Sequence, residues 1–164
     1  MVKDLFSYMK FRKRDVNLNF LFAHVVYSDD KSLKNVDKHI LKSDFYKIQG
    51  KPDYIFKTIF GNYIPVEIKS SNIKESYYPR ENEAMQLITY FFLVQDNYGK
   101  CKKGYLVYND KMFIIKNNSK VRGYFLKELN KMKKMINHGR GVCEPSFVKC
   151  RYCICRGTVC EFCD

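Results

Sequence analysis

The chain has 164 residues, 46% of them hydrophobic and 16% aromatic, and its formal net charge is +13. A chain of this length forms one domain with at most a small appendage, and its apolar content excludes a disordered tail. The charge and the pI near 9.4 indicate a polyanionic partner, with nucleic acid the first candidate and an anionic membrane surface the second.

The beginning of the sequence lacks the uninterrupted apolar core of a signal peptide, and no run of about 18 apolar residues could span a membrane. We therefore expect an intracellular, cytoplasmic protein with no membrane partner. Thiols stay reduced in that compartment, so the seven cysteines indicate metal binding rather than disulfides.

Apolar spacing first predicts a helix over residues 15–27, capped by Asp15. A polar loop follows, and strands are then predicted over residues 45–49, 53–60 and 63–69. The sequence Gly-Asn between the last two strands is a two-residue hairpin signal.

A second helix is predicted from residue 81 to about residue 95, followed by two strands in KGYLVYND and KMFIIKN and an amphipathic helix in YFLKELNKMKKMI. This order predicts an α/β (α+β) fold in which a central mixed sheet is flanked by helices. We expect a main domain over residues 1–140 and a cysteine-rich, metal-bound tail over residues 141–164.

Two charges in the strand predicted over 63–69, those of Glu67 and Lys69, are two residues apart and therefore share one face. Asp53 lies 14 residues before Glu67, so the hairpin can bring two carboxylates side by side. A divalent cation such as Mg²⁺ or Mn²⁺ stabilises such a pair and can activate a water for phosphodiester hydrolysis, with Lys69 beside it. An ordinary surface ion pair is the plainer explanation for Glu67 and Lys69 alone.

Four elements in this order resemble the PD-(D/E)XK nuclease superfamily. Pro52–Asp53 matches the PD motif and Glu67-Ile68-Lys69 matches the EXK motif. Gln86 and Tyr90 resemble the Gln-x-x-x-Tyr helix of the RecB-like branch, and GYLVY resembles the strand that follows this helix. The resemblance covers residues 20–109. It implies a restriction-endonuclease-like core and a metal-dependent deoxyribonuclease.

The resemblance also implies roles for single residues. The implied catalytic set is Asp53, Glu67, Lys69, Gln86 and Tyr90. The family has a metal-binding histidine on a helix before the Asp strand, which His24 matches, and its further metal ligand is a peptide carbonyl, here that of Ile68. For His24, a buried side chain bonded to a backbone carbonyl is the alternative.

The loop SSNIKESYYPR follows the EXK motif and mixes cations with aromatic residues, as single-strand binding surfaces do. We expect four of its residues to bind DNA: Lys74, Tyr77, Tyr78 and Arg80. A solvated loop without this role is an equal alternative for each.

The tail carries two CxxC pairs, Cys150 with Cys153 and Cys160 with Cys163. Pairs at this spacing allow either a structural zinc site or an iron–sulfur cluster. The first three of these cysteines resemble the C-terminal triplet of the CRISPR-associated RecB-like exonuclease family, the fourth of the numbered Cas proteins. That family holds a [4Fe–4S] cluster.

The family's fourth cluster ligand is a cysteine near the N-terminus, but no cysteine precedes Cys101 in this sequence. Either the position is lost or Cys163, Cys155 or Cys143 replaces it. We favour Cys163 as the fourth ligand, because it completes the second CxxC pair. Zn²⁺ remains an alternative to the cluster.

The leading hypothesis is a metal-dependent nuclease, an exonuclease on single-stranded DNA ends, which acts with CRISPR adaptation proteins or in DNA repair or a viral role. A non-catalytic nucleic-acid-binding protein with a zinc knuckle is one alternative. A junction-resolving or restriction-type endonuclease of the same superfamily is the other.

Overall fold

The computed structural model describes residues 9–12, 23–30, 32–74, 76–139 and 150–151. The chain divides into two compact units, Met1–Lys127 and Glu128–Asp164. The domain boundary expected between residues 140 and 141 lies outside the described residues.

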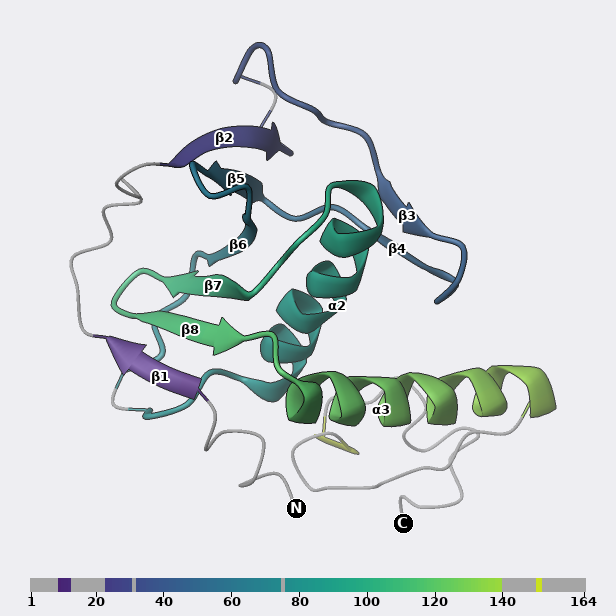
Figure 1. Ribbon diagram of the computed structural model, residues 1–164. Helices are drawn as coiled ribbons and strands as arrows, with labels where there is room; N and C mark the ends of the chain where they lie inside the picture. Colours follow the sequence, from purple (N-terminus) through teal and green to yellow (C-terminus); the bar gives the residue numbers. More distant parts are fainter. Residues whose placement is uncertain (1–8, 13–22, 31, 75, 140–149, 152–164) are drawn as a thin grey trace. The chain divides into compact units, whose positions relative to one another are not determined.

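The first unit is built on a six-stranded sheet (Figure 1). Its strand order is β1-β8-β7-β6-β5-β2, and of its neighbouring pairs only β6 and β7 are parallel. The strands are β1 (Met9–Arg12), β2 (Ala23–Ser28), β5 (Tyr54–Thr58), β6 (Tyr63–Lys69), β7 (Lys103–Tyr108) and β8 (Met112–Lys116).

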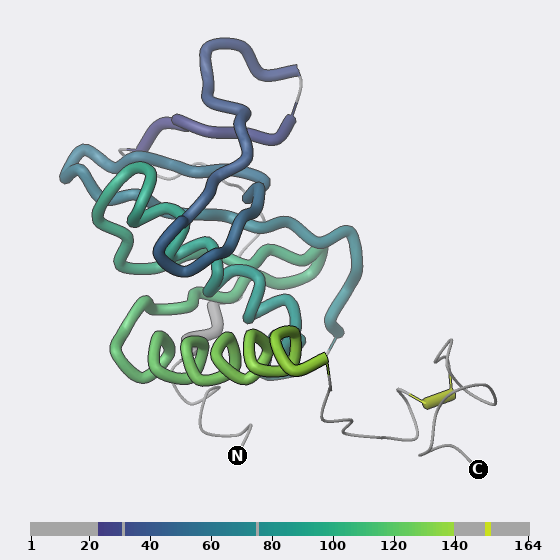
Figure 2. The backbone as a smooth tube through the Cα atoms, turned by 90° about the vertical axis from the view of Figure 1, so that its right-hand side faces the viewer, coloured from purple at the N-terminus to yellow at the C-terminus, as the bar shows by residue number. Residues whose placement is uncertain are grey.

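The described residues contain two long helices, α2 (Glu81–Asn97) and α3 (Ser119–His138), and the boundary between the two units falls within α3. Helix α2 connects the parallel strands β6 and β7, and a small second sheet of β3 (Leu41–Ser43) and β4 (Ile48–Gly50) lies against it (Figure 2). In the described part of the chain, neither helix is long and apolar enough to cross a membrane. The predicted mixed sheet with helices is confirmed.

Side chains alternate along each strand, so the six-stranded sheet has two faces. Both faces carry buried apolar residues. On one face Leu87 and Phe91 of α2 are fully buried, and α2 packs against β6 and β7. The other face carries a cluster of buried residues, namely Phe56, Ile64, Val66, Tyr105 and Val107.

The close approach of α2 to the sheet depends on Gly104 in β7. A Cβ atom at this position would lie 2.7 Å from the Phe91 ring, 2.9 Å from the Pro65 carbonyl oxygen and 3.0 Å from Leu87. Phe91 and Leu87 belong to α2, and the Pro65 carbonyl leaves no room on the strand side, so a side chain here would push the helix away from the strand pair.

The helix predicted over residues 15–27 is wrong where the structure describes it, since Ala23–Ser28 is strand β2, paired antiparallel with β5. Residues 15–22 lie outside the described residues. The segment is rich in β-branched and aromatic residues, which suit a strand. Its register shifts between Val25 and Tyr27, and this irregularity interrupts the strict alternation by which a strand is recognised.

The strands predicted over residues 45–49 and 53–60 begin and end at other residues in the structure. Instead of a strand over 45–49, the chain turns and forms β4 over Ile48–Gly50, paired with β3, which was not predicted. The hairpin between β5 and β6 exists, but its connection is longer than two residues: Thr58 donates its N–H to the Asn62 carbonyl, and Gly61 adopts a φ of 70°. Strands β6, β7 and β8 and helices α2 and α3 lie where predicted.

The substitution Gly104→Ala should destabilise the protein by about 1–3 kcal/mol, because the added methyl group overpacks the contact between α2 and β7. Urea unfolding monitored by circular dichroism measures this change. The matched control is Gly123→Ala in α3, where a Cβ atom meets nothing within 4 Å and a more stable helix, by about 0.5–1 kcal/mol, is expected. Equal stability of Gly104→Ala and the unmodified protein would contradict this packing.

Candidate functional site

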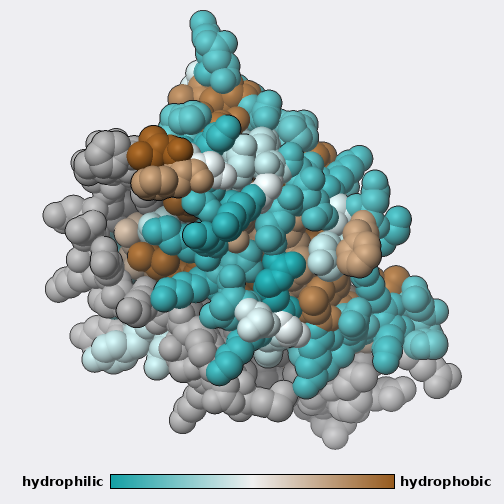
Figure 3. Space-filling view, in the orientation of Figure 1, coloured by the Kyte–Doolittle hydropathy of each residue, from teal (hydrophilic) through white to brown (hydrophobic). Residues whose placement is uncertain are grey.

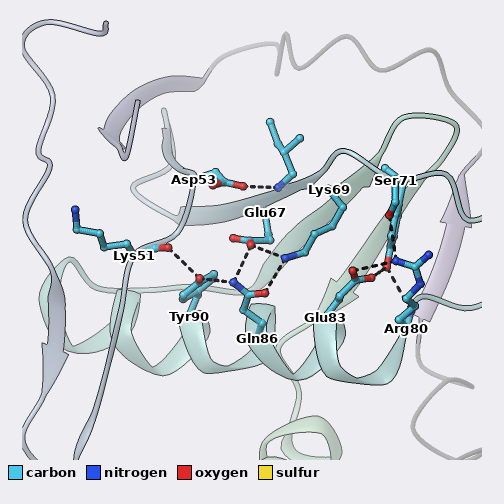
Figure 4. A network of polar contacts seen from close by, with 11 residues as sticks. Lys51, Asp53, Glu67, Lys69, Ser71, Arg80, Glu83, Gln86 and Tyr90 are labelled. Atoms are coloured by element: carbon cyan, nitrogen blue, oxygen red, sulfur yellow. Dashed lines mark hydrogen bonds and ion pairs between the residues drawn. The ribbon is translucent and has the colours of Figure 1, made fainter. Parts of the chain in front are cut away.

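The candidate site lies at the carboxyl end of β6, beside its parallel neighbour β7 (Figure 4). Glu67 and Lys69 share the face that α2 covers, as the alternation of β6 predicts, while Ile68 faces the other way and is 39% exposed. Crevices at the carboxyl ends of parallel strands are common ligand sites, because the connecting loops begin there.

Asp53 stands directly before β5 and joins the site through the backbone of β6. Its Oδ2 atom accepts a hydrogen bond of 2.6 Å from the Ile68 N–H. Strand pairing between β5 and β6 ends at Tyr54 and Val66, so the Asp53 carboxylate takes the place of the next backbone acceptor. In a strand the N–H and C=O of one residue point to the same neighbour, so the Ile68 carbonyl also points toward the Asp53 side.

Glu67, Lys69 and Gln86 form a closed triangle of hydrogen bonds. Lys69 Nζ donates to Glu67 Oε1 and to Gln86 Oε1, both at 2.8 Å. Gln86 Nε2 donates to the same Glu67 Oε1 atom, also at 2.8 Å. Each partner fixes the other two, so the carboxylate, the ammonium and the amide have one mutual orientation.

Tyr90 anchors this triangle to the second sheet. Gln86 Nε2 donates a second hydrogen bond to Tyr90 Oη at 2.8 Å, and the Tyr90 hydroxyl donates to the Lys51 carbonyl at 2.9 Å. Gly50 leaves room for the Tyr90 ring, because a Cβ atom there would lie 3.1 Å from it. Burial raises the pKa of Tyr90, which keeps the hydroxyl protonated as a donor.

The Glu67 carboxylate is buried, with its side chain only 6% exposed. Its Oε1 atom accepts the hydrogen bonds described above, but its Oε2 atom is buried and has no hydrogen-bond partner among the described residues. Burial raises the pKa of Glu67, and the hydrogen bond from Lys69 opposes that effect. Burial likewise raises the pKa of Asp53, against the Ile68 N–H and the charge of Lys69.

An open hollow of about 540 Å³ adjoins the Asp53 carboxylate, whereas Glu67 is not among its lining residues. Asp53 and Ile68 line it together with Ser70, Asn109, Tyr54, Asp29 and Asp30. Sequence reasoning missed Asp29 and Asp30, because it assigned the segment before them to a helix. Read as the end of a strand, the apolar run AHVVY followed by two aspartates would have placed them at the edge of the sheet.

His24 is not brought to this site. It lies on β2 and not on a helix, is exposed, and pairs in register with Lys57 of β5. Lys57 is four residues after Asp53, so His24 is roughly 13 Å along the strand direction from that carboxylate. The buried histidine considered as its alternative is also wrong.

Three of the four residues expected to bind DNA are brought together. Lys74, Tyr78 and Arg80 line one hollow of about 450 Å³ in the loop after β6. Tyr77 does not line this hollow and is 81% exposed. Arg80 donates from its guanidinium to Ser71 Oγ and Glu83 Oε1, so its position is fixed by the loop and by α2.

The four cysteines of the expected tail site are mostly beyond the described residues. Cys150 is half-buried and forms no disulfide with another described residue, whereas Cys153, Cys160 and Cys163 lie outside the described residues. Within the described ranges, no group of three or more His, Cys, Asp or Glu side chains is placed to hold a metal ion.

No protein-family model matches this sequence, and no curated protein matches it. The solved structure titled "Crystal structure of SSO0001" is similar over 75% of this chain, at 25% sequence identity and a TM-score of 0.49. This chain spans 56% of that protein's chain. At that TM-score the likeness supports no conclusion about this protein.

The substitution Tyr90→Phe should lower the free energy of unfolding by about 1–3 kcal/mol, because it leaves one Gln86 N–H and the Lys51 carbonyl without a partner in a partly buried place. Urea unfolding measures the change. Tyr77→Phe is the matched control: this ring is 81% exposed, so removal of its hydroxyl should leave the unfolding midpoint unchanged. If both variants unfold like the unmodified protein, Tyr90 does not anchor the triangle.

Proposed function

We propose that this protein is a divalent-metal-dependent deoxyribonuclease of the RecB-like branch of the PD-(D/E)XK superfamily, which hydrolyses phosphodiester bonds at single-stranded DNA ends. The observation that carries the proposal is the buried Oε2 atom of Glu67. It has no partner in the described part of the chain, although Lys69, Gln86 and Asp53 surround the same carboxylate. An unpaired buried carboxylate oxygen is costly, and a bound cation would offset that cost.

The donor set around Glu67 fits Mg²⁺ or Mn²⁺. Its members are Glu67 Oε2, the carboxylate of Asp53 and the Ile68 carbonyl on the same side of β6. All are hard oxygen donors, and Mg²⁺ needs only one or two carboxylates because waters and substrate phosphate complete its shell. When bound, the metal supplies charge stabilisation on the phosphate and a more acidic water.

Lys69 is held ready for a substrate by its two acceptors. An ammonium group carries three N–H donors, and two of them are used by Glu67 and Gln86. The third is left for a phosphate oxygen or for the water that attacks it. Because Glu67 and Gln86 hold it in place, the Lys69 ammonium can neutralise charge that develops on the phosphate.

DNA as the substrate is supported by the charge and by the loop after β6. The chain carries a net charge of +13, which favours a polyphosphate partner. Lys74, Tyr78 and Arg80 share one hollow, so cations and an aromatic ring converge in the loop that follows the strand of Lys69. That mixture suits an unpaired strand, whose bases are free to stack on a ring.

We further propose that the cysteine tail binds a [4Fe–4S] cluster through Cys150, Cys153, Cys160 and Cys163, with Zn²⁺ as the alternative. This part of the proposal rests on the spacing of the two CxxC pairs. A role beside CRISPR adaptation proteins follows from the resemblance of this tail to the CRISPR-associated RecB-like exonuclease family, and we propose a cytoplasmic location with it.

The substitutions Glu67→Gln, Asp53→Ala and Lys69→Ala should each lower the cleavage rate of a labelled single-stranded oligonucleotide in Mg²⁺ or Mn²⁺ by at least about 100-fold. Loss of one preorganised charge group from such a site typically costs this much. A denaturing gel over a time course measures the rate.

Two exposed residues provide matched controls for charge loss, Asp44→Asn and Lys42→Ala. Both variants should cleave at the unmodified rate. Cleavage retained in Glu67→Gln would overturn the proposed function, and so would an equal loss in Asp44→Asn.

Binding of the metal has its own readout in stability. At ten times its dissociation constant, Mg²⁺ should stabilise the folded protein by about 1.4 kcal/mol, because a ligand that binds only the folded state shifts the unfolding equilibrium. For a chain of this size the melting temperature should rise by roughly 3–6 °C. The rise should be absent in Glu67→Gln and unchanged in Asp44→Asn, as measured by differential scanning calorimetry.

A further inference from the structure

A third hollow, of about 320 Å³, lies at the other end of β6. Among its lining residues are Phe60 and Asn62 from the β5–β6 hairpin, Ile64 from β6, and Lys103 and Tyr105 from β7. Ile64 and Tyr105 belong to the sheet face opposite the one that carries Glu67. It shares no lining residue with the hollow beside Asp53, so it is separate from the candidate nuclease site.

Apolar side chains stand exposed at the rim of this hollow. Phe60 is 83% exposed and its neighbour Ile59 is 65% exposed, both at the tip of the hairpin. On the face drawn in Figure 3, by comparison, hydrophilic residues predominate and apolar residues form separate patches. An exposed aromatic ring beside a hollow offers a stacking surface that folding itself does not require.

Two lysines line the same hollow as the Phe60 ring. Lys102 and Lys103 both line the hollow, and Lys103 Nζ lies 5.3 Å from the centre of the Tyr105 ring. Within the described ranges, neither lysine takes part in an ion pair with a carboxylate. The two ammonium groups are thus available to an anionic ligand.

A residue of this hollow also has a buried polar atom with no hydrogen-bond partner among the described residues. The Oδ1 atom of Asn62 is buried, and none of the described residues donates a hydrogen bond to it. Its amide nitrogen makes only a long contact, 3.5 Å, with the Phe60 carbonyl. A buried amide oxygen without a donor is costly, and an N–H group of a ligand in the hollow would satisfy it.

We propose that this hollow binds one nucleotide of a single-stranded nucleic acid, away from the point of cleavage. Its base stacks on Phe60 and donates an N–H to Asn62 Oδ1, while Lys102 and Lys103 bind the adjoining phosphates.

Every base has a flat face and at least one N–H donor, so the site takes any sequence. Its volume is at the small end for ligand pockets, which suits one nucleotide. A base paired in a duplex is stacked on its neighbours and cannot enter. This inference rests on the proposed function only in taking DNA as the partner.

Binding is measured by fluorescence anisotropy with a labelled oligothymidine of 20 nucleotides, in EDTA and on a Glu67→Gln background, so that cleavage plays no part. Phe60→Ala should weaken binding by roughly 5- to 100-fold, the effect of losing one base-stacking partner. Phe45→Ala is the matched control, because Phe45 is 82% exposed and lies in another turn. Phe45→Ala should leave the dissociation constant unchanged.

The contribution of Lys102 and Lys103 is measured separately, from the salt dependence of the dissociation constant. The double variant Lys102→Ala/Lys103→Ala should reduce the slope of log Kd against log salt by about 1.4, because each phosphate contact on a single strand contributes about 0.7. Lys34→Ala/Lys42→Ala removes two exposed lysines elsewhere and should leave that slope unchanged.

The conservative variants Phe60→Tyr and Phe60→Leu distinguish the loss of base stacking from an effect on folding. Tyrosine keeps the stacking surface and should bind normally, whereas leucine keeps the apolar bulk and should bind like alanine. Equal affinities of Phe60→Ala and Phe45→Ala would overturn this inference even in an active nuclease. Loss of affinity in Phe60→Ala together with an inactive unmodified protein would uphold this site and overturn the nuclease proposal.

Discussion

The candidate site depends on one buried charge, the Glu67 carboxylate between the sheet and helix α2. Removing such a group from water is unfavourable unless hydrogen bonds and an opposite charge compensate it. Lys69 and Gln86 provide that compensation for one of its oxygens and leave the other unpaired. Every other feature of the site either holds these three side chains together or opens the space beside them.

Helix α2 can hold Gln86 over the strand because two glycines allow it to approach. Gly104 sets the contact of the helix with β7, and Gly50 sets its contact with β4 through the Tyr90 ring. Leu87 and Phe91, which meet Gly104, follow Gln86 and Tyr90 by one residue each, so the two contacts lie on adjoining strips of the helix. The position of the amide over Glu67 is therefore fixed from both sides.

Much of the fold could be predicted from the sequence, and the reasons for success and failure are physical. Strand β6 and helix α2 have unambiguous periodicities, and the alternation of β6 alone places Glu67 and Lys69 on one face. Strand β2 was missed because its register irregularity interrupts alternation, and His24 was misplaced with it. The bond from Tyr90 to the Lys51 carbonyl and the hollow beside Asn62 depend on how separate segments pack, which local patterns do not encode.

The strand order also bears on how the protein folds. Residues 51–90 contain all the groups that bind one another around Glu67, so this cluster forms by closing short loops between neighbouring segments. Strand β1, by contrast, reaches its place only when Met9 pairs with Ile115 of β8. Closing a loop of that length costs more chain entropy and delays pairing. The cluster around Glu67 can therefore assemble early, before the edge of the sheet is complete.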